Sequence, residues 1–279
     1  MISTSELKAI VKLLADESTL ELIKEQFEKF DDEVLKDIKK EIPSDNSSLQ
    51  NQFLKIILEV KRKKLKSAFK KWALSEVNDL EEGVFLIASF SNPFIDRKHY
   101  SGLLYKWARS ISENIEKRRL KEDPTSIVNE TNHFLFMENG FKGNKENYYD
   151  PENSFIDKVI DKKLGNPILL STIYLLVTKK LGLPFNGVNM PAHFLVKYED
   201  GYEPILVDPF NKGEIITKPI CLERVKALNL TWHDEYLSTP TNKQMVARML
   251  QNLINIYHNR EQYELKEYLE DYVNVLKSR

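Results

Sequence analysis

The sequence predicts an α+β protein that is mostly helical, with a small antiparallel sheet in a central region flanked by helical N- and C-terminal regions. Apolar residues recur at helical spacing before residue 125 and again after residue 239. Most glycines and several proline-containing turns fall between residues 127 and 236. Two short apolar runs there flank Asp200-Gly201, a pattern typical of a β-hairpin. We therefore divide the chain into residues 1–125, 126–238 and 239–279.

Composition narrows the classes of protein to consider. The chain has 279 residues, a net charge of -1 and one cysteine, Cys221, which cannot form an internal disulfide. Its first residues lack the basic and apolar regions of a signal peptide, and its apolar runs are too short to cross a bilayer. We expect a soluble, cytoplasmic protein with no membrane partner.

The first region is expected to be helical throughout. Ser3 with Glu6 and Ser18 with Glu21 have the spacing of capping boxes. A polar break at residues 43–48 precedes helices expected at 49–75, 79–91 and 96–118. The charged segment 116–125, which ends at Asp123-Pro124, supplies the boundary with the central region.

A run of seven basic residues lies between positions 61 and 71, with apolar residues interspersed at helical spacing. A solvated helix face explains such a run, and an acidic partner or a nucleic acid is the alternative. Because the net charge of the chain is close to zero, we favour the solvated face and consider binding to nucleic acid unexpected.

The centre of the molecule is expected to be one buried helix. Asn166 is a favoured N-cap, Pro167 suits the first helical position, and Gly182 suits the C-cap. Apolar side chains cover nearly every side between these ends, which indicates a helix enclosed by the domain. Ser171, one turn after Pro167, is either an unusual nucleophile or, as we favour, a buried hydroxyl bonded to a carbonyl of the preceding turn.

The hairpin places two polar residues opposite each other. Strands are expected at 193–198 and 205–208, and a turn centred on Asp200-Gly201 pairs His193 with Asp208, whether its loop has two residues or four. The alternate residues, from Phe194 to Val207, then supply core. A carboxylate bonded to one imidazole nitrogen orients the other nitrogen for chemistry. From spacing alone, the simpler interpretation is that His193 and Asp208 only form a satisfied polar contact at the end of the sheet and take no part in chemistry.

The C-terminal region is predicted to form a helical hairpin. Thr241 and Gln244 have capping-box spacing at the start of its first helix, and two apolar stripes follow. Such a pair resembles one unit of a tetratricopeptide-like (TPR-like) array.

A family resemblance sharpens the site hypothesis. The central segment resembles the transglutaminase-like superfamily, in which Gly-x-Cys opens a buried helix that ends in Gly-x-Pro. Here the two frames read Gly165-Asn166-Pro167 and Gly182-Leu183-Pro184. The resemblance implies a papain-like core in which His193 and Asp208 match the family histidine and aspartate. Pro167 then stands where the enzymes carry their nucleophilic cysteine.

The closer likeness is to the bacterial SirB-type branch, which includes an F-box protein relative in animals. It extends from about residue 80 to 257, and the first ~70 residues match no part of the pattern. Ala192 departs from a usual glycine. The resemblance adds Asn153, Asn166 and Tyr149, with the neighbouring Tyr148, as ligand-binding candidates. The matching segments are residues 139–144, 148–154, 165–168, 187–195, 208–213 and 248–253.

Proline provides no nucleophile, whereas acyl transfer by this family requires a thiolate. The sequence therefore predicts a non-catalytic regulatory or adaptor module that binds a protein segment or small ligand at a degenerate groove. The alternative is a hydrolase or amide-transfer enzyme that uses His193 and Asp208 without a cysteine. We expect no cofactor and no metal, because no phosphate-binding glycine motif is present and the histidines lack ligand spacing.

Overall fold

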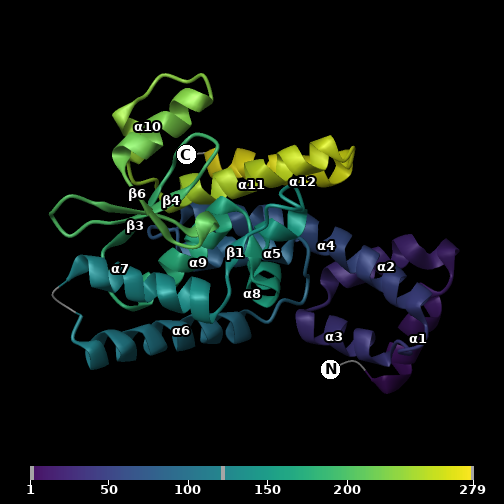
Figure 1. Cartoon of the computed structure of the whole chain (residues 1–279). Helices are drawn as coiled ribbons and strands as arrows, with labels where there is room; N and C mark the ends of the chain where they lie inside the picture. The colour runs from purple at the N-terminus through teal and green to yellow at the C-terminus, as the bar shows by residue number, and fades with distance from the viewer. Residues whose placement is uncertain (1–2, 121–122, 278–279) are drawn as a thin grey trace.

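The computed structural model describes residues 3–120 and 123–277, and its helices surround one four-stranded antiparallel sheet (Figure 1). The N-terminal residues Met1 and Ile2, and residues 121–122 of the predicted boundary segment, lie outside the described part. The mostly helical α+β prediction is confirmed. The helices are α1 (Thr4–Leu14), α2 (Leu20–Lys29), α3 (Asp32–Glu41), α4 (Ser47–Leu74), α5 (Leu80–Ser89), α6 (Arg97–Arg118), α7 (Pro124–Asn132), α8 (Ile156–Lys162), α9 (Pro167–Lys180), α10 (Lys218–Ala227), α11 (Asn242–Asn259) and α12 (Tyr263–Lys277).

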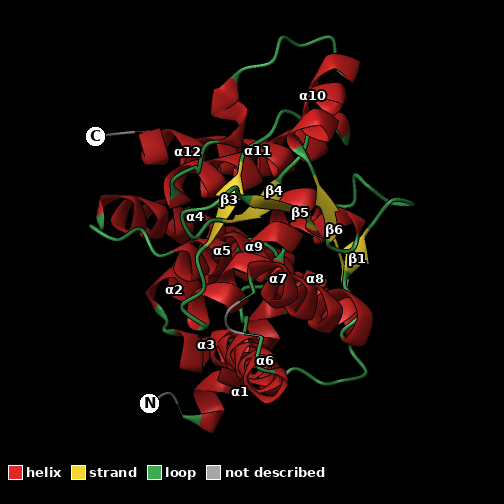
Figure 2. Ribbon diagram, turned by 60° about the vertical axis from the view of Figure 1, so that its left-hand side comes forward, coloured by secondary structure: helices red, strands yellow, loops and turns green. Residues whose placement is uncertain are grey.

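The sheet has the strand order β3-β4-β5-β6, and a separate parallel pair joins β1 to β2. Figure 2 shows the sheet between α9 on one side and α10 on the other. The strands are β1 (Lys142–Gly143), β2 (Leu164–Gly165), β3 (Phe185–Val188), β4 (Leu195–Tyr198), β5 (Ile205–Asp208) and β6 (Glu214–Ile216).

Local sequence explains most helix ends. The capping box of Ser3 with Glu6 forms at α1, and that of Thr241 with Gln244 forms at α11. The second predicted N-terminal box is wrong. Asp16 instead accepts a bond from the Ser18 amide and caps a short 3-10 turn before α2. A carboxylate two residues before a backbone amide readily accepts its hydrogen bond, so Asp16 acts as the cap here and the predicted box of Ser18 with Glu21 does not form.

The hairpin forms with a different register from the one predicted. Val196 pairs with Val207 and Tyr198 with Ile205, so the loop comprises residues 199–204, and β4 begins at Leu195 rather than at His193. The loop is longer because Pro204 cannot donate a ladder hydrogen bond. The register is shifted by two residues, which leaves every side chain on its expected face.

Two clusters of buried apolar residues cover the two faces of this sheet. Phe194, Val196 and Val207 join the main core with α9, whereas Leu195 and Leu206 lie in a smaller cluster with α10. Helices α1 to α3 and the first half of α4 form a third cluster, which includes Phe27 and Phe53. The predicted domain boundaries at 125/126 and 238/239 remain a proposal.

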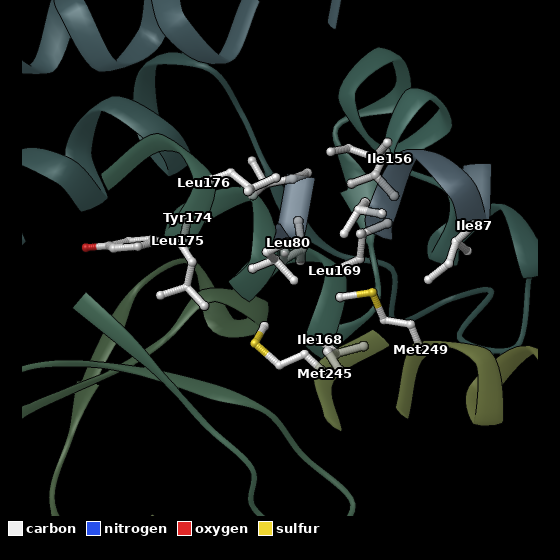
Figure 3. Packing of buried hydrophobic residues seen from close by; sticks show 14 of the residues in the cluster. Leu80, Ile87, Ile156, Ile168, Leu169, Tyr174, Leu175, Leu176, Met245 and Met249 are labelled. Atoms are coloured by element: carbon white, nitrogen blue, oxygen red, sulfur yellow. The ribbon is translucent and has the colours of Figure 1, made fainter. Parts of the chain in front are cut away.

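Helix α9 is the centre of the main core, as its sequence predicts. Figure 3 shows side chains of α9 enclosed by residues of α5, α8 and α11. Ser171 is buried, but its hydroxyl donates to the carbonyl of Phe194 at 3.2 Å rather than to its own helix. This bond fixes the second turn of α9 against the residue that follows His193.

Helices α11 and α12 pack against each other, and α12 also contacts α4 (Figure 1). The predicted C-terminal helical hairpin is therefore present, and its likeness to a TPR-like unit remains a prediction. Among the described residues, none of the helices combines the length and apolarity needed to cross a membrane.

Candidate functional site

The imidazole of His193 contacts the carboxylate of Asp208, with 2.8 Å between Nε2 and Oδ1. This contact was predicted from their spacing. It forms although His193 precedes β4, because the side chain reaches diagonally toward the end of β5. Asp208 is fully buried, and 18% of the His193 side chain is exposed. One residue of the pair therefore faces solvent while the other lies inside the protein.

Asp208 is bound by donors from three further groups. Arg224 on α10 donates to Oδ2 at 2.7 Å, and Asn211 donates its side-chain amide to Oδ2 at 2.9 Å and its backbone N–H to Oδ1 at 3.3 Å. Burial by itself raises the pKa of Asp208, but the bonds from His193, Arg224 and Asn211 outweigh it and hold the pKa at about 2. The carboxylate is therefore anionic at neutral pH.

An anionic Asp208 determines the tautomer of a neutral His193. A carboxylate only accepts hydrogen bonds, so Nε2 carries the proton and Nδ1 presents its lone pair. Nδ1 has no hydrogen-bond partner within residues 3–120 and 123–277. The imidazole can thus accept a proton or a hydrogen bond from a ligand.

Neighbouring groups hold this imidazole in place. The ring of Phe210 meets it edge to face, with 6.0 Å between centroids, and Arg248 on α11 donates to the His193 carbonyl at 2.8 Å. Ala192 has φ of 53°, in the left-handed region that favours glycine. The glycine that the resemblance leads us to expect at position 192 thus has a physical reason, which is the turn before His193.

The start of α9 provides no nucleophile. Pro167 is buried at the first helical position, and the Asn166 side chain caps the helix by accepting from the Leu169 amide at 2.9 Å. The Asn166 amide also donates to Ser154 Oγ at 2.9 Å. The short helix Pro209–Asn211 after β5 contacts α9, which brings the loop after Asp208 close to this helix.

Two other ligand candidates have different surroundings. Asn153 is buried, and its side chain bonds the carbonyls of Asn147 and Tyr148 and the side chain of Asn144. It therefore shapes the loop before it. The side chains of Tyr149 and Tyr148 are both exposed, and Tyr148 packs edge to face on Phe210, with 5.8 Å between the ring centroids. Tyr148 is thus connected to His193 through Phe210.

The remaining candidate nucleophiles are enclosed. Cys221 is fully buried inside α10, and burial raises the pKa of its thiol. The hydroxyl of Ser171 is also fully buried and bonded to Phe194. Neither group can reach a substrate without a rearrangement of the core.

The contacts of Arg224 and Asn211 with Asp208, and of Arg248 with the His193 carbonyl, were not predicted from the sequence. Asn211 carried a local signal, since an aspartate followed three residues later by a polar residue is a capping pattern. Arg224 and Arg248 carried none. They reach the pair because α10 and α11 pack beside it, and this arrangement is a property of the tertiary fold.

Known proteins resemble this chain. A family model described as the transglutaminase-like superfamily matches residues 98–251, just over half of the chain. A UPF0162 protein of Xylella fastidiosa is 31% identical over 204 residues, which cover 69% of this chain and 71% of that protein. A UPF0162 protein of Vibrio cholerae is 32% identical over 161 residues, covering 53% of this chain and 59% of that protein.

Human F-box only protein 21 is 26% identical over 232 residues, which cover 72% of this chain and 36% of that protein. No solved structure matches the chain. The family match accords with the mostly helical α+β fold. The chain belongs to the transglutaminase-like superfamily.

Proposed function

We propose that this protein is a non-catalytic member of its superfamily that binds a protein segment or a small ligand beside His193. The observation that carries the proposal is the buried Pro167 at the start of α9, where the family resemblance expects a cysteine. Because Cys221 and Ser171 are enclosed as well, no thiol or hydroxyl on α9 or α10 is available for covalent catalysis.

In this proposal, the His193–Asp208 pair binds the ligand and catalyses no reaction. The Nδ1 atom of His193 is a hydrogen-bond acceptor, and the bond between Nε2 and the buried carboxylate fixes the orientation of the ring. The rings of Tyr148 and Phe210 provide an apolar wall nearby. An extended peptide with a donor group, or a small polar ligand, fits these features.

A regulatory or adaptor role in the cytoplasm accords with this proposal. The similarity to F-box only protein 21 supports a protein segment as the ligand. The single, buried cysteine accords with a reducing compartment.

The alternative is a hydrolase or amide-transfer enzyme in which His193 activates water or a substrate hydroxyl. The imidazole–carboxylate contact of 2.8 Å has the geometry of a general base. A general base alone contributes about 10²–10⁴-fold to a rate, which falls short of most complete enzymes. We therefore favour binding.

A screen with p-nitrophenyl esters and p-nitroanilides separates the two functions. Wild type and His193→Ala should hydrolyse these substrates equally slowly. A wild-type rate that exceeds the His193→Ala rate by about 100-fold or more, with both proteins folded, would establish catalysis by His193 and overturn the proposal.

A further inference from the structure

A hollow in the surface is lined by two segments that are far apart in sequence, one of which is the turn that follows Asp208. It has a volume of about 420 Å³. Residues 142–146, together with Leu164, form one side, and Phe210, Asn211 and Lys212 form the other. His193 is not among the lining residues, so this hollow is distinct from the face that the imidazole presents.

The lining is strongly basic although the chain as a whole is not. Lys142, Lys145 and Lys212 line the hollow, and Glu146 is the one acidic residue among the described lining residues. No carboxylate lies within ion-pair distance of these three ammonium groups in the part of the chain that the structure describes. The hollow therefore concentrates positive charge on a protein whose net charge is -1.

Close backbone packing shapes the floor of the hollow. A Cβ atom on Gly143 would lie 2.6 Å from the ring and from the carbonyl oxygen of Phe210, so only glycine permits this approach. Gly143 also pairs with Gly165 in the β1–β2 ladder. The floor is thus built by contacts between β1, β2 and the turn after β5, and it does not depend on mobile side chains.

We propose that this hollow is a binding site for a small phosphorylated ligand. Its volume lies within the range of about 300–1,000 Å³ that is typical of small-molecule sites. Lysine ammonium groups bind compact phosphate groups as point charges, whereas the fork of arginine binds carboxylates and phosphates alike. The described lining residues include three lysines and no arginine.

Such a ligand would lie next to the His193–Asp208 pair without touching the imidazole. Asn211 lines the hollow and donates twice to Asp208, and Phe210 lines it and meets His193 edge to face. Binding of a phosphorylated ligand in the hollow does not depend on the ligand proposed for His193. The two sites share only the Pro209–Asn211 turn and can be tested separately.

Calorimetric titration of the full chain with pyrophosphate tests the proposal. Wild type should bind pyrophosphate at low salt, and the triple variant Lys142→Ala, Lys145→Ala, Lys212→Ala should bind it at least about tenfold more weakly. The matched control replaces three other exposed lysines that lie outside the lining of the hollow: Lys8, Lys12 and Lys55. It removes the same net charge and should bind within about twofold of wild type, and circular dichroism checks that all variants are folded.

Two further arms identify the ligand class and separate the two sites. Citrate should bind more weakly than pyrophosphate, and His193→Ala should keep wild-type affinity for pyrophosphate because His193 does not line the hollow. The proposal is overturned if pyrophosphate does not bind wild type in the millimolar range, or if both triple variants lose affinity equally. Binding of citrate as tight as that of pyrophosphate would overturn the phosphate assignment.

Discussion

Asp208 is the residue on which the site geometry depends most. It is fully buried, and it accepts hydrogen bonds from His193, Arg224 and Asn211. Loss of the carboxylate charge would leave the His193 imidazole and the partly exposed Arg224 guanidinium without their shared acceptor. Asp208 therefore stabilises the fold as well as orienting the imidazole.

Asp208 should therefore produce a specific acid dependence of stability. Its folded pKa of about 2 lies below the ordinary 3.8, so its contribution is complete above the ordinary value and is lost as pH falls through about 2. The difference corresponds to about 2 kcal/mol. Urea unfolding from pH 5 to pH 2 should show a shallower loss of stability in Asp208→Asn than in wild type. The exposed Asp200→Asn is the control, and equal slopes in wild type and Asp208→Asn would contradict this account.

Ala192 carries backbone strain that glycine would relieve. Its φ of 53° costs a non-glycine residue about 1–2 kcal/mol, and the greater freedom of glycine in the unfolded chain offsets part of the gain. Ala192→Gly should therefore raise the free energy of unfolding by up to about 1 kcal/mol. Ala247→Gly, inside α11, should lower it by about 1 kcal/mol. Equal destabilisation of both variants in urea would show that Ala192 is unstrained.

At the scale of elements, the site forms where short, irregular segments meet. The pair β1–β2 and the Pro209–Asn211 turn pack through Gly143 and Phe210, and α9 contacts the same turn. These contacts need close backbone approach rather than large apolar area. This explains why the site lies in the glycine-rich central region of the sequence.

Gly143→Ala should disturb this junction. The added Cβ would lie 2.6 Å from the ring and the carbonyl oxygen of Phe210, so Phe210 must shift, and the fold is destabilised by about 1–3 kcal/mol. Gly102→Ala is the matched control, because its Cβ meets no atom within 4 Å and alanine favours the interior of α6 by about 1 kcal/mol. Thermal unfolding should therefore move in opposite directions for the two variants. A neutral Gly143→Ala would contradict the tight packing of β1 against Phe210.

Patterns that are local in sequence predicted these elements well. Tertiary packing determined the strand register and the hydrogen-bond partner of Ser171, which local patterns did not predict. Composition and the spacing of apolar residues predict three features: the N-cap at Asn166, the burial of α9 and the faces of the hairpin. The His193–Asp208 contact was predicted despite the wrong register, because a shift of two residues preserves sidedness. Ser171 was assigned to the wrong carbonyl because the proximity of Phe194 depends on how β4 lies against α9.

At the scale of the whole molecule, the candidate site combines four elements. Position 167 begins α9, His193 precedes β4, Asp208 ends β5, and Arg224 comes from α10. Asp208 binds both His193 and Arg224, and Figure 2 shows the sheet that carries Asp208 between α9 and α10. The helices α1 to α3 lie apart from this region and have their own apolar cluster (Figure 1). We therefore expect the site to depend on the main core and not on that cluster.

In the proposed site, Pro167 occupies the place of a nucleophile facing His193. The variant Pro167→Cys, made with Cys221→Ser, tests it most directly. The first helical position does not require proline, and both the helix N-terminus and a charged His193 lower the pKa of a thiol placed there. Because position 167 is buried, its thiol is compared with Cys221 of wild type and with the same variant carrying His193→Ala.

The measurement is the rate of alkylation by iodoacetamide at neutral pH, in proteins confirmed as folded by circular dichroism. The account predicts that the thiol at position 167 reacts faster than Cys221 in wild type, and that His193→Ala removes most of this excess. A rate that does not depend on His193, or one no higher than that of Cys221, would contradict the claim that position 167 faces the His193–Asp208 pair.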